Sequence, residues 1–190
     1  MRQSAAVDVR YTAREYFGLV EKGLLQAGDH VELLEGVIVA MSPQNPAHAT
    51  ATTMASRALS RALRGRGVVR VQLPLVLSKR SVPEPDVALV EGMPEDYLDE
   101  HPRSALLVIE VADSSLAQDR LSKSRIYAAA EIPEYWLVNL RDMWVETFRD
   151  PSRSIRSYRT VARAAANSVL ELAALPGVRV RARDLLPRRR

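Results

Sequence analysis

The segment ALLVIEV, residues 105–111, constrains the fold most, because it is apolar along its whole length except at Glu110. A strand with one wet face alternates apolar and polar side chains, whereas a strand covered on both faces is apolar throughout. This run therefore predicts a central strand of a sheet that carries helices. Glu110 lies near its end, where an ionised carboxylate is costly to bury unless a cation or hydrogen-bond donors meet it.

The N-terminal part predicts a helix and a hairpin. Thr12 and Glu15 have the spacing of a capping box, which predicts a helix from there to about residue 22. The β-prone runs 30–34 and 37–41 flank Gly36, whose freedom at positive φ suits a tight hairpin turn.

Further elements alternate along the rest of the chain. Asn45 and Pro46 resemble the N-cap and first residue of a helix that ends near Gly65. Strands are expected at 68–77, 86–90, 134–139, 143–149, 154–160 and 178–182, and another helix at 114–130 with Ser114 or Ser115 as N-cap. This order predicts an α/β or α+β sheet flanked by helices, with α/β the fold class we expect, in one domain spanning residues 1–190.

Composition narrows the chemistry. The chain has no cysteine and three histidines, so any metal must bind oxygen or imidazole ligands, and a hard cation on carboxylates is favoured. A net charge of +4 and a basic tail at 187–190 are compatible with a nucleic-acid partner. We find no signal peptide and no membrane span, so we expect a cytoplasmic protein without a membrane association.

Three polar residues suggest a site. Asp86 follows Pro85 and opens a strand, Glu110 lies near the end of the central strand, and Lys123 interrupts the apolar face of the helix predicted at 114–130. Helical side chains lean towards the N-terminus, so Lys123 should reach back towards Glu110. Alternatively, Glu110 pairs with an arginine or caps the helix, and Lys123 forms an i,i+4 ion pair with Asp119.

A resemblance enters at four segments. They are VELLEGVIVAMSPQNPAHA (31–49), VPEPDVALV (82–90), LLVIEVADSS (106–115) and QDRLSKSRIYAAAEIPEYWLVN (118–139). In this order they resemble the Uma-type family of restriction endonucleases, in the PD-(D/E)xK nuclease superfamily, over about residues 11–150. The resemblance implies a restriction-endonuclease-like mixed sheet flanked by helices, with an N-terminal helix and β-hairpin.

It also implies roles for particular residues. Asp86 and Glu110 would be catalytic metal ligands for Mg²⁺ or Mn²⁺, and the carbonyl of Val111 would complete the protein ligands. Lys123 would replace the lysine that usually stands two residues after the second acid. Glu32 matches an acid of the hairpin that binds a second cation or positions water, although an exposed strand residue is the alternative.

Other positions match or depart from the pattern. His48 and Gln72 match recurring polar positions, while Ala112 stands where the usual lysine would be. Glu131 replaces a glycine, and Asn139 replaces an acid that commonly ends its strand. Two further expectations are structural: Glu35 is a turn residue, and Tyr135 with Trp136 packs in the core.

Three functions compete at this point. The first is a Mg²⁺- or Mn²⁺-dependent endonuclease that hydrolyses DNA with a metal-activated water and acts as a homodimer, since two related sites can cut both strands. The second is an inactive module of the same fold that binds nucleic acid or a protein. The third is a structural α/β protein whose acids are simply paired.

Overall fold

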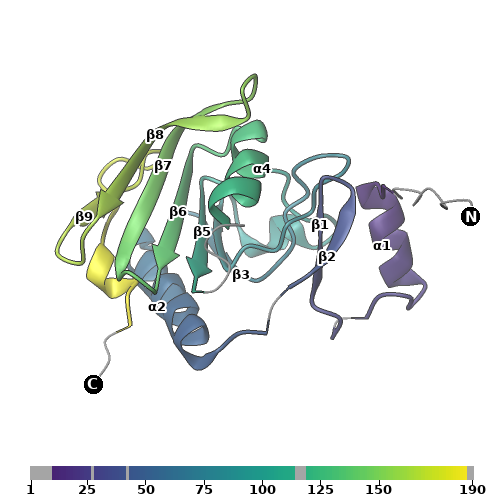
Figure 1. The fold of residues 1–190 in the computed structure, drawn as a ribbon, viewed down its shortest axis with the longest axis horizontal. Helices are drawn as coiled ribbons and strands as arrows, with labels where there is room; N and C mark the ends of the chain where they lie inside the picture. Colours follow the sequence, from purple (N-terminus) through teal and green to yellow (C-terminus); the bar gives the residue numbers. More distant parts are fainter. Residues whose placement is uncertain (1–9, 27, 42, 114–118, 188–190) are drawn as a thin grey trace, which may run out of the picture.

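The computed structural model describes residues 10–26, 28–41, 43–113 and 119–187. Its centre is a six-stranded mixed sheet with the order β3-β4-β5-β6-β7-β8 (Figure 1). Strands β5 and β6 are parallel, and the other neighbouring pairs in this sheet are antiparallel. The strands are β3 (Val68–Val71), β4 (Val87–Val90), β5 (Leu107–Ala112), β6 (Glu134–Asn139), β7 (Trp144–Ser152) and β8 (Ser157–Ala164).

Helices cover both faces of this sheet, as the apolar run predicted. Every residue of β5 is buried, and its side chains alternate between two hydrophobic clusters. Helix α2 (Pro46–Leu63) packs on one face through residues such as Leu59, and α4 (Ser124–Ala129) packs on the other through Tyr127. Tyr135 and Trp136 are fully buried on opposite faces, which confirms their predicted place in the core.

The N-terminal helix and hairpin form as predicted. Helix α1 (Ala13–Glu21) begins at Thr12 with the capping box to Glu15 in place. Strands β1 (Val31–Leu34) and β2 (Val37–Ala40) pair across a two-residue turn of Glu35 and Gly36. Both turn residues have positive φ, 49° and 89°, which is the geometry of a type I′ hairpin. Backbone hydrogen bonds between Leu33 and Val82 attach the hairpin to the segment that connects β3 and β4.

The C-terminal segment adds a second hairpin beside α2. Strands β9 (Val169–Glu171) and β10 (Arg179–Arg181) pair antiparallel, and a short 3-10 helix, η3 (Ala182–Asp184), follows. Val180 and Leu185 join the same hydrophobic cluster as α2, so this segment packs on the α2 face of the sheet. The prediction at 178–182 located β10, but β9 and the 3-10 helix η1 (Pro94–Tyr97) were not predicted.

Several boundaries differ from the predictions. Strand β3 ends at Val71 rather than 77, because Gln72 turns to φ 52° and Pro74 cannot donate to a ladder. The strand expected at 154–160 is β8, which begins and ends later. Glu131, where the family resemblance implies a glycine, has φ 59°, a conformation that glycine adopts more readily.

Within the described residues, the helix expected at 114–130 consists of a π-helical turn, η2 (Asp119–Lys123), followed by α4. The N-cap expected at Ser114 or Ser115 lies outside the described residues. Within the described ranges, none of the helices has the length and apolar character needed to cross a membrane.

Candidate active site

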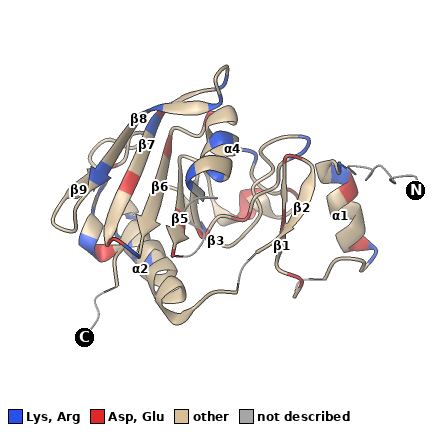
Figure 2. Cartoon of the chain, viewed as in Figure 1, with Lys and Arg blue, Asp and Glu red and all other residues tan. Residues whose placement is uncertain are grey.

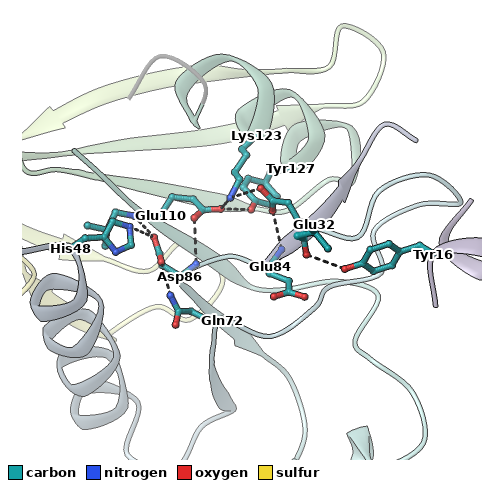
Figure 3. A network of polar contacts seen from close by, with 11 residues as sticks. Tyr16, Glu32, His48, Gln72, Glu84, Asp86, Glu110, Lys123 and Tyr127 are labelled. Carbon is teal, nitrogen blue, oxygen red and sulfur yellow. Dashed lines mark hydrogen bonds and ion pairs between the residues drawn. The ribbon is translucent and has the colours of Figure 1, made fainter. Parts of the chain in front are cut away.

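Four polar side chains from separate elements meet at one edge of the sheet (Figure 3). Asp86 immediately precedes β4, and Glu110 lies on β5, where the antiparallel register places the two side by side. Lys123 ends the π-helical turn before α4, and Glu32 lies on β1. All four side chains are buried, so their charges act in a medium of low polarity.

Asp86 and Glu110 are held by each other's strands. The Asp86 carboxylate (Oδ2) accepts a hydrogen bond of 2.8 Å from the main-chain N–H of Val111. In return, the Glu110 carboxylate (Oε2) accepts the main-chain N–H of Asp86 at 3.3 Å. This reciprocal bracing fixes both carboxylates relative to the β4–β5 pair. Val111 thus contacts the site through its N–H, while the metal role of its carbonyl remains a prediction.

Lys123 joins the two other acids. Its ammonium (Nζ) lies 2.9 Å from Oε1 of Glu110 and 3.2 Å from Oε1 of Glu32. The expectation that Lys123 reaches back to Glu110 is therefore met in the geometry. The competing pair with Asp119 falls on a side chain outside the described residues. Glu32 is buried rather than exposed. Its other oxygen accepts the main-chain N–H of Glu84 at 3.1 Å.

Two residues with uncertain roles in the sequence contact Asp86 directly. Nε2 of His48, in the first turn of α2, lies 3.2 Å from Oδ2 of Asp86. The Gln72 amide donates to Oδ1 at 3.3 Å, from the position where β3 breaks off. The break in β3 therefore has a local consequence, since it aims Gln72 at the acid.

Two residues of this network were missed by sequence reasoning. The fully buried Tyr127 donates from its hydroxyl to Oε1 of Glu110 at 2.6 Å. Burial, reinforced by Glu110 and Glu32, raises the pKa of Tyr127 well above its ordinary value, so it stays a donor. The i,i+4 spacing of Lys123 and Tyr127 could have revealed this, because such residues share a helix face. Glu84 gave no comparable signal, since it precedes its strand in a proline-rich turn.

Buried acids elsewhere are neutralised differently. Glu134 accepts bonds from Arg149 at 2.7 Å and from the Trp136 indole at 2.8 Å. Glu146 binds Arg120 through both oxygens, at 2.6 and 2.8 Å. Those acids have the arginine partner that was one alternative for Glu110, whereas Glu110 contacts a lysine, a tyrosine and a backbone amide.

The donor set suits a hard divalent cation. Glu32 and Glu110 both contact the ammonium of Lys123, and Asp86 lies beside Glu110 on the neighbouring strand, so these three carboxyl groups outnumber the ammonium. Oxygen donors of this kind are those that Mg²⁺ prefers. Among the described residues, no three His, Asp or Glu side chains gather closely enough to hold a metal alone. Main-chain and water oxygens would therefore complete the shell, as is usual for Mg²⁺.

The sequence profile of the Uma2 family, described as "Putative restriction endonuclease", matches residues 14–184. The chain belongs to the Uma2 family. No curated protein sequence matches this Uma2 protein. The match extends beyond residue 150, where the resemblance seen in the sequence ends, and it includes the C-terminal hairpin.

Solved structures bear on the fold. One protein from Anabaena variabilis, described as "a putative nuclease belonging to DUF820", is 13% identical with a TM-score of 0.69. The match covers 92% of this Uma2 chain and 96% of that one, and the shared fold confirms the mixed α/β architecture that was expected. The type IIG restriction endonuclease BpuSI is 18% identical over 60% of this chain and 13% of its own, with a TM-score of 0.38, too slight a likeness to inform fold or function.

Replacing Tyr127 with phenylalanine should lower the free energy of unfolding by about 2 kcal/mol, since it removes a buried hydrogen bond to a charged group. Urea unfolding measures this change. Tyr158→Phe is the matched control, because that buried hydroxyl donates to the carbonyl of Ile132, a neutral acceptor, at 2.9 Å. It should cost about 1 kcal/mol. Equal losses in the two variants would show that the bond to Glu110 has no special weight.

Glu84 should make stability depend on pH. Burial and the nearby Glu32 raise its pKa from 4.5 to about 7, against the opposing effect of Lys123. The folded state thus binds more protons between these two values, so stability should fall as pH rises through that interval and level off above it. At about 1.4 kcal/mol per unit the full shift corresponds to about 3 kcal/mol, and solvent screening of this partly exposed carboxyl lowers the expected contribution to about 1 to 2 kcal/mol.

Glu84→Gln should remove this dependence. The free energy of unfolding of the variant, taken relative to wild type, should therefore be higher at pH 8 than at pH 5. Urea unfolding at both pH values measures this difference. Glu91→Gln, at an exposed position, is the control and should follow wild type. A Glu84→Gln variant whose stability changes with pH as wild type does would contradict the assignment.

Proposed function

We propose that this Uma2 protein is a divalent-metal-dependent endonuclease that hydrolyses DNA phosphodiester bonds. The observation that supports this most is the meeting of Asp86, Glu110 and Lys123 in one buried hydrogen-bonded network. Membership of the Uma2 family and its description support the same reaction class.

In this proposal Asp86, Glu110 and the Val111 carbonyl hold Mg²⁺ or Mn²⁺. Bound there, the cation would lower the pKa of a water and offset charge on a phosphoryl oxygen. The bracing of both acids by main-chain amides keeps the ligands in place without reorganisation, which favours a preorganised site.

Lys123 supplies a fixed positive charge next to the acids. Its bonds to Glu110 and Glu32 hold the ammonium in place, so it can orient a water or stabilise the negative charge that develops on the phosphate. Glu32 positions this lysine through the same contact, and it can accept a proton from the attacking water. Tyr127 fixes the oxygen of Glu110 that faces Lys123.

The test is cleavage of supercoiled plasmid in Mg²⁺ or Mn²⁺. Wild type should produce nicked and linear DNA, and chelation by EDTA should stop the reaction. Asp86→Ala should be inactive, whereas Asp99→Ala, at an exposed position, should cut at the wild-type rate. DNA that is retained but never cut under any of these metals would favour the inactive binding module. Direct appearance of linear product would support action as a homodimer.

A further inference from the structure

Charge is strongly segregated along the chain. Between Glu35 and Glu84 lie 48 residues, 36–83, with seven basic residues and no acid. Helix α2 falls inside this stretch, so its arginines have no acidic neighbours on the helix itself. Near the other end of the chain, residues 179–183 carry an arginine at every second position.

The fold brings these two basic segments together. A cleft of about 740 Å³ lies between α2 and the segment formed by β10 and η3. Basic residues of that segment lie beside α2 in Figure 2. The charged residues that line the cleft are five arginines and one aspartate: Arg57, Arg61, Arg179, Arg181, Arg183 and Asp184.

Acids neutralise part of this cleft. Arg179 lies 3.0 Å from Glu171, and Arg181 lies 3.1 Å from Asp184. Arg57, Arg61 and Arg183 are exposed, and within the described part of the chain no ion pair or hydrogen bond involves their side chains. Arg57 and Arg61 are also four residues apart on one helix, where like charges repel. The cleft therefore carries an uncompensated positive charge that an anion would stabilise.

We propose that this arginine cleft binds the phosphate backbone of DNA beside the cleavage centre. Its assignment to DNA rests on the proposed function. Helix α2 connects the two places, since His48 in its first turn contacts Asp86. At 1.5 Å per residue, Arg57 and Arg61 lie about 14 and 20 Å further along the helix axis. That length corresponds to about four to six base pairs of duplex.

Guanidinium chemistry favours phosphate in this place. Its planar fork donates two parallel hydrogen bonds to a phosphate, and exposed arginines on both walls can each meet one group of a regularly spaced polyanion. An acidic protein segment could satisfy the charge as well, so the experiment includes it as an outcome.

Binding of a labelled 24-base-pair duplex, followed by fluorescence anisotropy in EDTA at several NaCl concentrations, tests the proposal without cleavage. The variant Arg57→Ala/Arg61→Ala/Arg183→Ala should raise Kd by about tenfold or more. Its plot of log Kd against log salt should be shallower by about 2 to 3 than that of wild type, one unit per lost phosphate contact. The control Arg14→Ala/Lys22→Ala removes two exposed charges from around α1 and should change Kd less than about twofold.

A triple variant that binds with the affinity and salt slope of the control would overturn the proposal, as would a wild type that binds no duplex. Competition by polyglutamate as strong as that by unlabelled duplex, at equal charge, would assign the cleft to an acidic protein and also overturn it. Hydrolysis of bis(p-nitrophenyl) phosphate separates the two ideas, because this small diester does not reach the cleft. We expect Asp86→Ala to lose this hydrolysis and the triple variant to keep it. A wild type that does not hydrolyse the diester would count against the proposed function and not against the arginine cleft.

Discussion

Replacing Lys123 with methionine should lower the free energy of unfolding at pH 7 by about 3 to 5 kcal/mol, because two buried carboxylates lose their shared cation. Methionine fills a similar volume, so the loss is electrostatic rather than a cavity effect. In the folded protein Lys123 lies within ion-pair distance of both Glu110 and Glu32, and all three are buried.

Urea or thermal unfolding at pH 7 measures this effect. Lys22→Met is the matched control, because Lys22 is exposed after α1 and should be nearly neutral to replace. Plasmid cleavage by Lys123→Met should be lost even under conditions where the variant is folded. A variant as stable as wild type would mean that the acids do not depend on this ammonium.

Glu110→Gln should abolish cleavage while leaving the fold close to wild type. The change keeps the shape of the side chain, and it removes one of the two acids that share Lys123, so Glu32 and the ammonium remain paired. Metal binding at the proposed site, in contrast, would lose a charged ligand. We expect the cleavage rate to fall by about 10³-fold, which is about 4 kcal/mol of transition-state stabilisation.

Calorimetric titration with Mn²⁺ and plasmid cleavage check this prediction together. Mn²⁺ affinity should fall by about tenfold or more in Glu110→Gln, and Glu95→Gln, at an exposed position, should behave as wild type. Full cleavage by Glu110→Gln would remove this residue from the metal site. Loss of cleavage with unchanged metal affinity would instead assign Glu110 to holding Lys123.

Local signals predicted much of the fold. The capping box at Thr12, the Asn45–Pro46 start of α2 and the turn at Gly36 each depend on a few neighbouring residues, and all three form. The continuous apolar run around Ile109 likewise identified the central strand. Elements set by distant contacts were harder to predict, and β9 was missed because its three residues, VLE, lack the apolar–polar alternation that VRVRA shows around β10.

The candidate site was predicted in part for the same reason. Asp86, Glu110 and Lys123 stand out as polar residues on apolar elements, and the structure brings them together. Tyr127 was missed because a tyrosine on a buried helix face usually indicates a core residue and not a member of a polar network. The contacts of Glu84 with Glu32 and of Gln72 with Asp86 depend on how two irregular segments cross. No periodic pattern in the sequence predicts such a crossing.

The reciprocal bonds between Asp86, Glu110 and Val111 have a consequence for biosynthesis. Each acid is aligned by an amide of the neighbouring strand, so neither is aligned until β4 and β5 have paired. A one-residue slip in the register of those strands would place the two carboxylates on opposite faces of the sheet. Under the proposed function, a partly folded nascent chain therefore lacks an assembled site, and only the finished molecule can cleave DNA.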